Sequence, residues 1–179
     1  DYPRLSRLKG LVFQPDADVP ANELLVFNVR KPPLSERNVR QAIAYAIDRS
    51  LIIQRVQAGL GSPGRSAIDS RLSWAYNPQV DYQKQYAYDP AKANALLDEA
   101  GFPRKADGSR FTLRVTFDIR RAGFLPTAEI IRDQLRAVGI QVQLEGVERS
   151  VMVDKVFMNW DFDMTIQNLE WGAFSSANT

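Results

Sequence analysis

The chain has 179 residues, of which 45% are apolar, and its 23 basic and 21 acidic side chains leave a net charge of +2. This length and apolar share fit one ordinary globular domain with a hydrophobic core. Because histidine and cysteine are both absent, the chain cannot supply a Cys/His zinc site, a thiol nucleophile, a Ser-His-Asp triad or a disulfide bond. We expect neither a metal nor a cofactor.

The basic side chains are interleaved with acidic ones, as residues 35–40 and 131–136 show. Nucleic-acid binding draws its affinity from clustered cations, so we expect no nucleic-acid partner. No apolar run approaches the roughly 18 residues that span a bilayer. The chain starts at Asp1 and shows no signal peptide, and we therefore expect a piece of a longer protein.

The first part of the chain predicts a lead-in segment followed by a strand. Residues 1–22 are rich in proline and aspartate, and we expect a lead-in loop with a short edge strand in them. Residues 23–29 are β-prone. Pro32 and Pro33 stop this run, because the residue before a proline is pushed out of the helical region.

Helical periodicity begins after Ser35, which is a good N-cap residue. Apolar residues recur three or four positions apart from 39 to 51, and the pattern extends to Gly59. One helix, or two helices broken near residues 48–50, both fit this pattern. Residues 59–88 are irregular and rich in aromatic side chains, which indicates a functional loop or a wrapped surface segment.

The second half of the chain alternates strands and helices. Asp89 and Pro90 mark the start of a helix and Gly101 its end. The sequence predicts strands at 111–117, 140–144 and 162–167, and helices at 125–138 and 150–157. Strand, helix and strand at this spacing form a right-handed βαβ unit. The predicted class is α/β, with a mixed, mostly parallel sheet flanked by helices.

Two loops that follow predicted strands are candidate ligand sites, because ligands of open α/β sheets gather beyond the carboxyl ends of the strands. Arg120 and Arg121 follow the strand at 111–117, and their guanidinium groups could hold an anion. The alternative is a solvated surface loop. Trp171 beside Gly172 could form a flat stacking wall, and the alternative there is a core tryptophan.

A catalytic interpretation has weaker support. Asp161 and Asp163 are two apart and share a face if they lie in a strand, so one carboxyl could have a raised pKa for acid–base work. Polar capping of the strand is the alternative interpretation. The glycines of residues 59–64 follow a helix and lack a Gly-Lys-Ser/Thr sequence, so we interpret them as a turn rather than a phosphate-binding loop.

Several segments occur together in an order that resembles the family 5 extracytoplasmic solute-binding proteins, the peptide, nickel and opine group that serves ABC importers. These segments cover roughly residues 11–172 and are Leu25-Val26-Phe27-Asn28 with Pro32-Pro33, residues 39–49, Gly59 to Pro63, Tyr88-Asp89-Pro90 with Ala93, residues 96–102, Gln134-Leu135 to Gly139-Ile140, and Phe162-Asp163-Met164 before Trp171.

The resemblance implies a two-lobed (class II, cluster C type) periplasmic-binding-protein fold that closes on a solute. It implies that residues 1–179 form a partial single lobe, with 1–22 as the lead-in segment and the first lobe missing. The implied partners are a peptide or other small-molecule solute, ABC permease subunits and the missing lobe. The implied location is the periplasm, or the cell exterior with a membrane anchor in a Gram-positive organism.

The resemblance also places four regions at the cleft. These regions supply the candidate ligand-binding residues Asn28, Arg65, Arg120, Arg121, Phe124, Trp171, Gly172 and Phe174. Peptide-binding members of the family usually have an aspartate three residues after the tryptophan, where it pairs with the amino group of the peptide. Phe174 stands at that position here, and a buried ammonium without a counter-charge is expensive. We therefore expect an anionic or aromatic solute, unless the missing lobe or a shifted residue supplies the carboxylate.

The resulting hypothesis is a non-enzymatic, solute-binding component of an ABC import system that captures a peptide-like or other small polar solute. Two alternatives stay open. One is an α/β hydrolase-type enzyme that uses Asp161 and Asp163, and the other is a solute-sensing or chaperone binding module.

Overall fold

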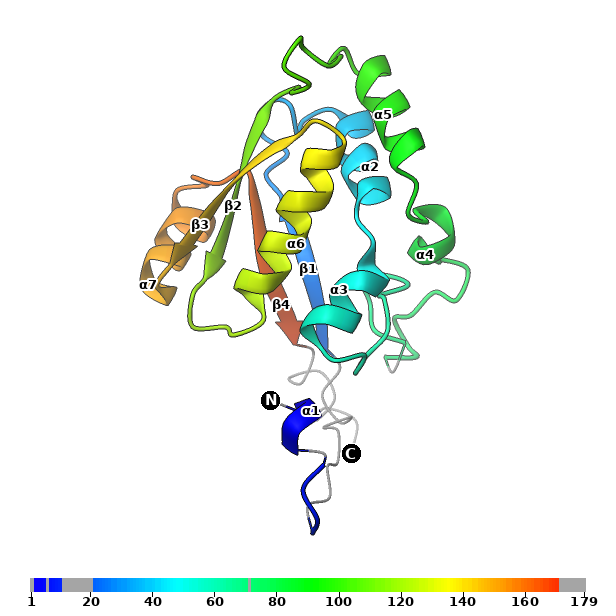
Figure 1. Ribbon diagram of the computed structural model, residues 1–179, viewed down its shortest axis with the longest axis vertical. Coiled ribbons are helices and arrows are strands. Elements are labelled where there is room, and N and C mark those ends of the chain that lie inside the picture. The colour runs from blue at the N-terminus through cyan, green and yellow to red at the C-terminus, as the bar shows by residue number, and fades with distance from the viewer. Residues whose placement is uncertain (1, 6, 11–20, 71, 171–179) are drawn as a thin grey trace.

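A computed structural model describes residues 2–5, 7–10, 21–70 and 72–170. Its centre is one four-stranded sheet in the order β1-β4-β2-β3 (Figure 1). The strands are β1 (Ala21–Phe27), β2 (Thr112–Asp118), β3 (Gln141–Val147) and β4 (Met164–Glu170). Strand β2 is parallel to both β3 and β4, whereas β1 is antiparallel to β4. The prediction of a mixed, mostly parallel sheet flanked by helices is confirmed.

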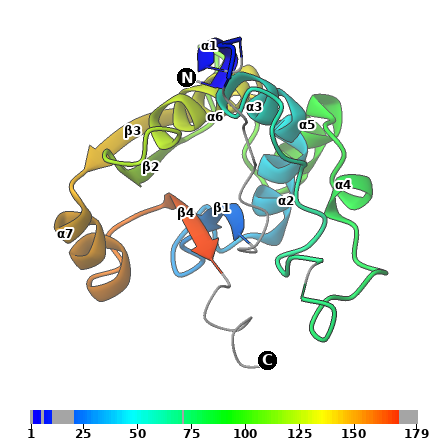
Figure 2. The same ribbon diagram turned by 90° about the horizontal axis from the view of Figure 1, so that it is seen from below.

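Helices cover both faces of this sheet (Figures 1 and 2). They are α2 (Arg37–Ala46), α3 (Arg49–Val56), α4 (Tyr82–Gln85), α5 (Pro90–Glu99), α6 (Phe124–Ala137), α7 (Arg149–Met152) and the π-helical turn η1 (Val153–Met158). None of the helices in the described residues is long and apolar enough to cross a membrane.

The lead-in segment differs from its prediction. The structure has a short helix α1 (Tyr2–Leu5) at the start of the segment where we expected a loop. At its end, the edge strand β1 begins at Ala21, inside the predicted lead-in segment. Residues 11–20 lie outside the described residues.

The periodic segment after the prolines forms two helices. Ile47 is extended between α2 and α3, and the carboxylate of Asp48 restarts the helix by accepting a hydrogen bond from the Leu51 backbone N–H at 3.1 Å. Ser35 is not the N-cap. That position is Glu36, without a side-chain cap bond, and the carbonyl oxygen of Ser35 instead accepts a hydrogen bond from the Arg40 guanidinium at 2.8 Å.

The βαβ unit is confirmed as β2, α6 and β3. Helix α6 ends at Ala137, and Gly139 follows two residues later with a φ of +88°, which favours glycine. A Cβ atom at this position would lie 2.9 Å from the carbonyl oxygen of Gly108, so the close passage of two turns also requires glycine. Strand β3 runs to Val147, three residues further than predicted, and the predicted final helix divides into α7 and η1.

The core lies between the sheet and the layer of α2, α5 and α6. Alternate residues of β2 point into it, because successive side chains of a strand face opposite sides. The largest buried side chains of this core include Val39, Ile43, Leu97, Leu113, Val115, Ile131, Leu135, Ile140, Met164 and Ile166. On the other face, Met152, Val156 and Phe162 form a smaller cluster beneath α7 and η1.

Candidate functional site

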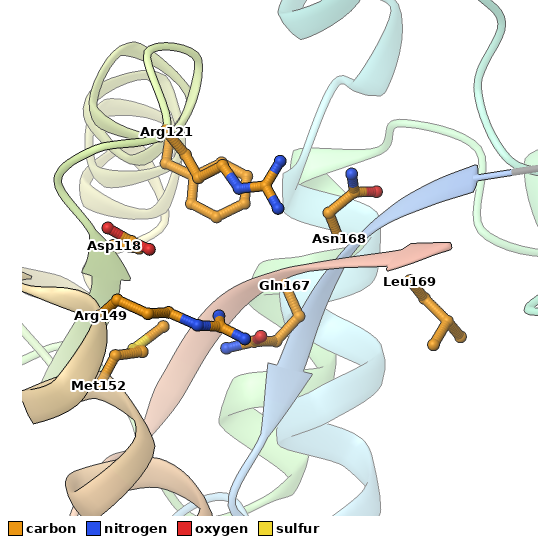
Figure 3. A pocket seen from close by; sticks show the side chains of 8 residues that line it. Asp118, Arg121, Arg149, Met152, Gln167, Asn168 and Leu169 are labelled. Carbon is orange, nitrogen blue, oxygen red and sulfur yellow. The ribbon is translucent and has the colours of Figure 1, made fainter. Parts of the chain in front are cut away.

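A polar cavity of about 310 Å³ lies where β2 and β4 end and α6 begins (Figure 3). We call it cavity 1. Its lining residues come from four elements and are Asp118, Arg121, Phe124, Arg149, Met152, Gln167, Asn168 and Leu169. Because β2 and β4 are parallel, their carboxyl ends meet at one edge of the sheet, which is the usual place for ligands in this fold class.

The loop from β2 to α6 places Arg120 and Arg121 in different surroundings. The carboxylate of Asp118 is buried and accepts a hydrogen bond from the Arg120 backbone N–H at 3.0 Å. The Arg120 guanidinium lies 3.6 Å from the same carboxylate and 4.0 Å from that of Glu148. Arg121 instead lines cavity 1, and Phe124 at the start of α6 forms a buried part of its wall.

A second cavity of about 300 Å³, which we call cavity 2, adjoins the first. The two share three lining residues, namely Arg121, Phe124 and Asn168. Cavity 2 adds Glu23 from β1, whose carboxylate accepts a hydrogen bond from the Thr127 hydroxyl at 3.2 Å. Desolvation by the neighbouring residues raises the pKa of this carboxyl group, although Glu23 is an exposed residue.

Arg149 brings a second guanidinium group to cavity 1 from the start of α7. Figure 3 shows it near Gln167 of β4, with Arg121 approaching from the opposite side. Sequence reasoning missed Arg149, Gln167 and Glu23. The strand-end rule could have found Gln167. Glu23 lies near the amino-terminal end of β1 and reaches this edge of the sheet only because β1 is antiparallel to β4.

Arg65 lies at the same end of the sheet but lines neither cavity. Its loop is tied to β1, where the Asn22 side chain donates a hydrogen bond to the carbonyl oxygen of Ala67 at 3.0 Å. The carbonyl oxygen of Arg65 accepts a hydrogen bond from the Tyr82 backbone N–H at 2.7 Å. The backbone of this loop is therefore anchored at the cavity end of the sheet, and Arg65 is exposed.

Asn28 lies at the opposite end of the sheet from both cavities. It is buried, and its side-chain amide donates hydrogen bonds to the carbonyl oxygens of Trp160 and Phe162 at 3.0 and 2.9 Å. These bonds connect the end of β1 to the segment that enters β4, which is a structural role. The structure thus brings Arg121 and Phe124 together and separates them from Asn28. The predicted residues Trp171, Gly172 and Phe174 lie outside the described residues.

The aspartates of the enzyme alternative also lie at the end of the sheet away from the cavities. Asp161 pairs with Lys155 at 2.8 Å and with Arg114 at 2.6 Å. Hydrogen bonds from Lys155 and then Arg114 lower the pKa of Asp161 to about 2. The carboxylate of Asp163 accepts a hydrogen bond from the Arg114 backbone N–H at 2.8 Å. The lowered pKa of Asp161 is the opposite of the raised pKa that acid–base catalysis would need. The described residues also contain no group of three potential metal ligands of the His, Cys, Asp and Glu types.

Known proteins similar to this chain are transport-related binding proteins. The dipeptide-binding protein of Escherichia coli is 42% identical over 128 residues, which cover 69% of this chain and 22% of that protein. The oligopeptide-binding protein AppA of Bacillus subtilis is 29% identical over 156 residues, which cover 83% of this chain and 28% of that protein. This chain therefore spans about a quarter of the length of these relatives.

Solved structures agree with the sequence relatives. The structure of AppA from Bacillus subtilis with a nonapeptide has a TM-score of 0.76 and 27% identity, over 86% of this chain and 31% of that chain. AgaA from Agrobacterium tumefaciens R10 with agropinic acid has a TM-score of 0.72 and 32% identity, over 83% and 28%. The model of the bacterial extracellular solute-binding proteins, family 5, matches residues 1–178. The chain belongs to this family.

Proposed function

We propose that this chain forms one wall of the ligand-binding cleft of a solute-binding protein that serves an ABC importer. The whole protein would capture a small polar solute between this lobe and a second one, and would deliver it to membrane permease subunits in the periplasm or at the cell exterior. The ligand would favour the closed state through its contacts with both lobes.

The observation that carries this proposal is the composition of cavity 1. Arg121 and Arg149 approach the cavity from different elements, while Gln167 and Asn168 add amide groups from β4. Guanidinium groups bind carboxylates and phosphates through paired hydrogen bonds. The ligand class that fits this wall is therefore a solute with an anionic group, such as a carboxylate.

Capture without catalysis agrees with the charges elsewhere in the lobe. Asp161 and Asp163, the carboxylates of the hydrolase alternative, are engaged by Lys155 and Arg114 at the other end of the sheet. The relatives named above are binding proteins. We therefore propose binding and release of an unchanged solute.

The test uses the full-length protein, purified and incubated with a mixture of dipeptides and opine-like acids. After desalting, mass spectrometry identifies what the protein retains, and titration calorimetry measures the affinity for the retained solute. A double variant, Arg121→Gln with Arg149→Gln, should retain at least roughly tenfold less, because each charge-assisted hydrogen bond contributes about 1.5–3 kcal/mol. The variant Arg136→Gln, on the exposed face of α6, is the control. Retention of no solute by the wild-type protein, or equal retention by the double variant, contradicts the proposal.

A further inference from the structure

Two carboxylates, those of Asp118 and Glu23, line the pair of cavities, and they have different hydrogen-bond and ion-pair partners. Asp118 in cavity 1 is buried and lies beside Arg120, which gives it both a backbone N–H and a guanidinium partner. Glu23 in cavity 2 has a single neutral partner, the hydroxyl of Thr127. Within the part of the chain that the structure describes, no ion pair joins Glu23 to a lysine or an arginine.

The position of Glu23 is fixed by its strand and by the helix above it. Glu23 pairs with Asn168 in the register of β1 and β4, and Asn168 lines both cavities. Thr127 is buried on the first turn of α6. Its hydroxyl donates to one oxygen of the carboxylate, so the side chain is positioned against the cavity wall while the group remains exposed to the cavity.

A carboxylate in this state is a ready partner for a cation. The surrounding wall makes its ionised form less favourable, and an ammonium group in the cavity would supply the missing opposite charge. Resting on the proposed function, we infer that Glu23 is a specificity-determining residue that binds a cationic group of the solute. Its ammonium or similar group lies in cavity 2, and its anionic group lies in cavity 1 against Arg121 and Arg149.

The size and continuity of the cavities fit one zwitterionic solute. Their volumes of about 310 and 300 Å³ are each at the lower end of the range for small-molecule sites. Because they share Arg121, Phe124 and Asn168, the two charged ends of a solute would lie on either side of one common wall.

The experiment compares solutes that differ only in the amino group. Full-length wild-type protein and the isosteric variant Glu23→Gln are each incubated with a dipeptide mixture and with the same mixture after N-acetylation, and retained solutes are quantified by mass spectrometry. Wild-type protein should prefer the free amine by roughly tenfold or more, and Glu23→Gln should reduce that preference to about threefold or less, since a charge-assisted hydrogen bond is about twice as strong as a neutral one. The variant Glu23→Asp should restore part of the preference. The control variant Glu129→Gln changes an exposed carboxylate of α6 outside both cavities.

The outcomes separate this inference from the proposed function. If wild-type protein retains solutes from both mixtures equally, or if Glu23→Gln keeps the preference for the free amine, the role of Glu23 is overturned while solute capture stands. If wild-type protein retains nothing from either mixture, solute capture is contradicted, and the role of Glu23 is contradicted with it. Loss of the amine preference in Glu23→Gln with unchanged retention by Glu129→Gln supports the inference.

Discussion

Near the amino-terminal ends of β2 and β4, four charged side chains pair with one another and line neither cavity, whereas at the carboxyl ends of the same strands charged side chains line the two cavities. Arg114 pairs with Asp161 at 2.6 Å and with Glu145 at 3.4 Å. Lys155 pairs with the same two carboxylates at 2.8 and 2.9 Å. This closed ring, which we call the ionic ring, connects β2, β3 and η1 to the start of β4.

The cavity end differs in what its side chains face. Arg121 and Arg149 line cavity 1, and Glu23 lines cavity 2, where its carboxylate accepts a hydrogen bond from the Thr127 hydroxyl. The four side chains of the ionic ring line neither cavity, whereas side chains that line a cavity can reach a ligand there. The comparison therefore predicts that substitutions at the ionic ring change stability and that substitutions at the cavities change ligand affinity.

The largest expected effect is the loss of the ionic ring. Arg114→Ala should lower the free energy of unfolding of the full-length protein by about 2 kcal/mol, because it leaves two carboxylates with one cation between them. Thermal and denaturant unfolding measure this change, and titration calorimetry should show an unaltered solute affinity. Arg136→Ala on the exposed face of α6 is the matched control, with an expected change of less than about 0.5 kcal/mol. A loss of affinity without a loss of stability in Arg114→Ala would contradict the comparison.

The reciprocal change is made at the cavities. Arg121→Gln should weaken solute affinity roughly tenfold, which corresponds to about 1.4 kcal/mol, and should leave the melting temperature within about 1–2 °C of wild type. The same calorimetric and unfolding measurements apply. If the melting temperature falls as far as in Arg114→Ala while affinity holds, the assignment of binding to this end of the sheet is wrong.

A pH titration sharpens the comparison at Asp161. The pKa of this carboxyl is about 2 in the folded protein, below its ordinary value of 3.8, because Lys155 and Arg114 donate hydrogen bonds to it. A depressed folded-state pKa contributes stability that is present above pH 3.8 and is lost as the pH falls toward 2. We expect Asp161→Asn to be less stable than wild type at neutral pH and equal to it near pH 2. Unfolding measured from pH 7 to pH 2 checks this, and a difference that persists undiminished at pH 2 would argue against the ring.

The smallest effect is expected at Glu23, and its sign is opposite. The pKa of Glu23 is raised in the folded protein, so its ionised form is disfavoured and its contribution to stability falls as the pH rises above its ordinary value of 4.5. Glu23→Gln should therefore be equal to or slightly more stable than wild type at pH 7 without solute, and this gain should disappear below pH 4.5. Unfolding of solute-free protein measures it, and clear destabilisation at pH 7 would indicate a structural role for the carboxylate.

Local patterns were enough to predict much of the fold. Asp89 and Pro90 start α5 as expected, since the Asp89 carboxylate accepts a hydrogen bond from the Lys92 backbone N–H at 2.9 Å. Caps, prolines and apolar periodicity act within a few residues, so they can be read from the chain itself. Ser35 was a wrong prediction by one position, because α2 begins at Arg37 and its N-cap is Glu36.

The candidate site was only partly predictable, because its residues come from segments that are far apart in the chain. The strand-end rule led to Arg121 and the resemblance to the family added Phe124, and both line the cavities. The resemblance also added Asn28, which is buried at the far end of the sheet. Arg149, Gln167 and Glu23 could not be placed together from sequence, because they come from α7, β4 and β1.

The sequence by itself determined the α/β class, the family and the absence of histidine and cysteine chemistry, since these depend on composition, order and short-range pattern. Only the tertiary structure decided which charges form the ionic ring and which line a cavity. That choice depends on the antiparallel direction of β1 and on the register of β4 between its neighbours, which carry Glu23 to the carboxyl end of the sheet and Asp161 to the other. Pairing of charges is a matter of distances between segments far apart in the chain, and no local pattern encodes those distances.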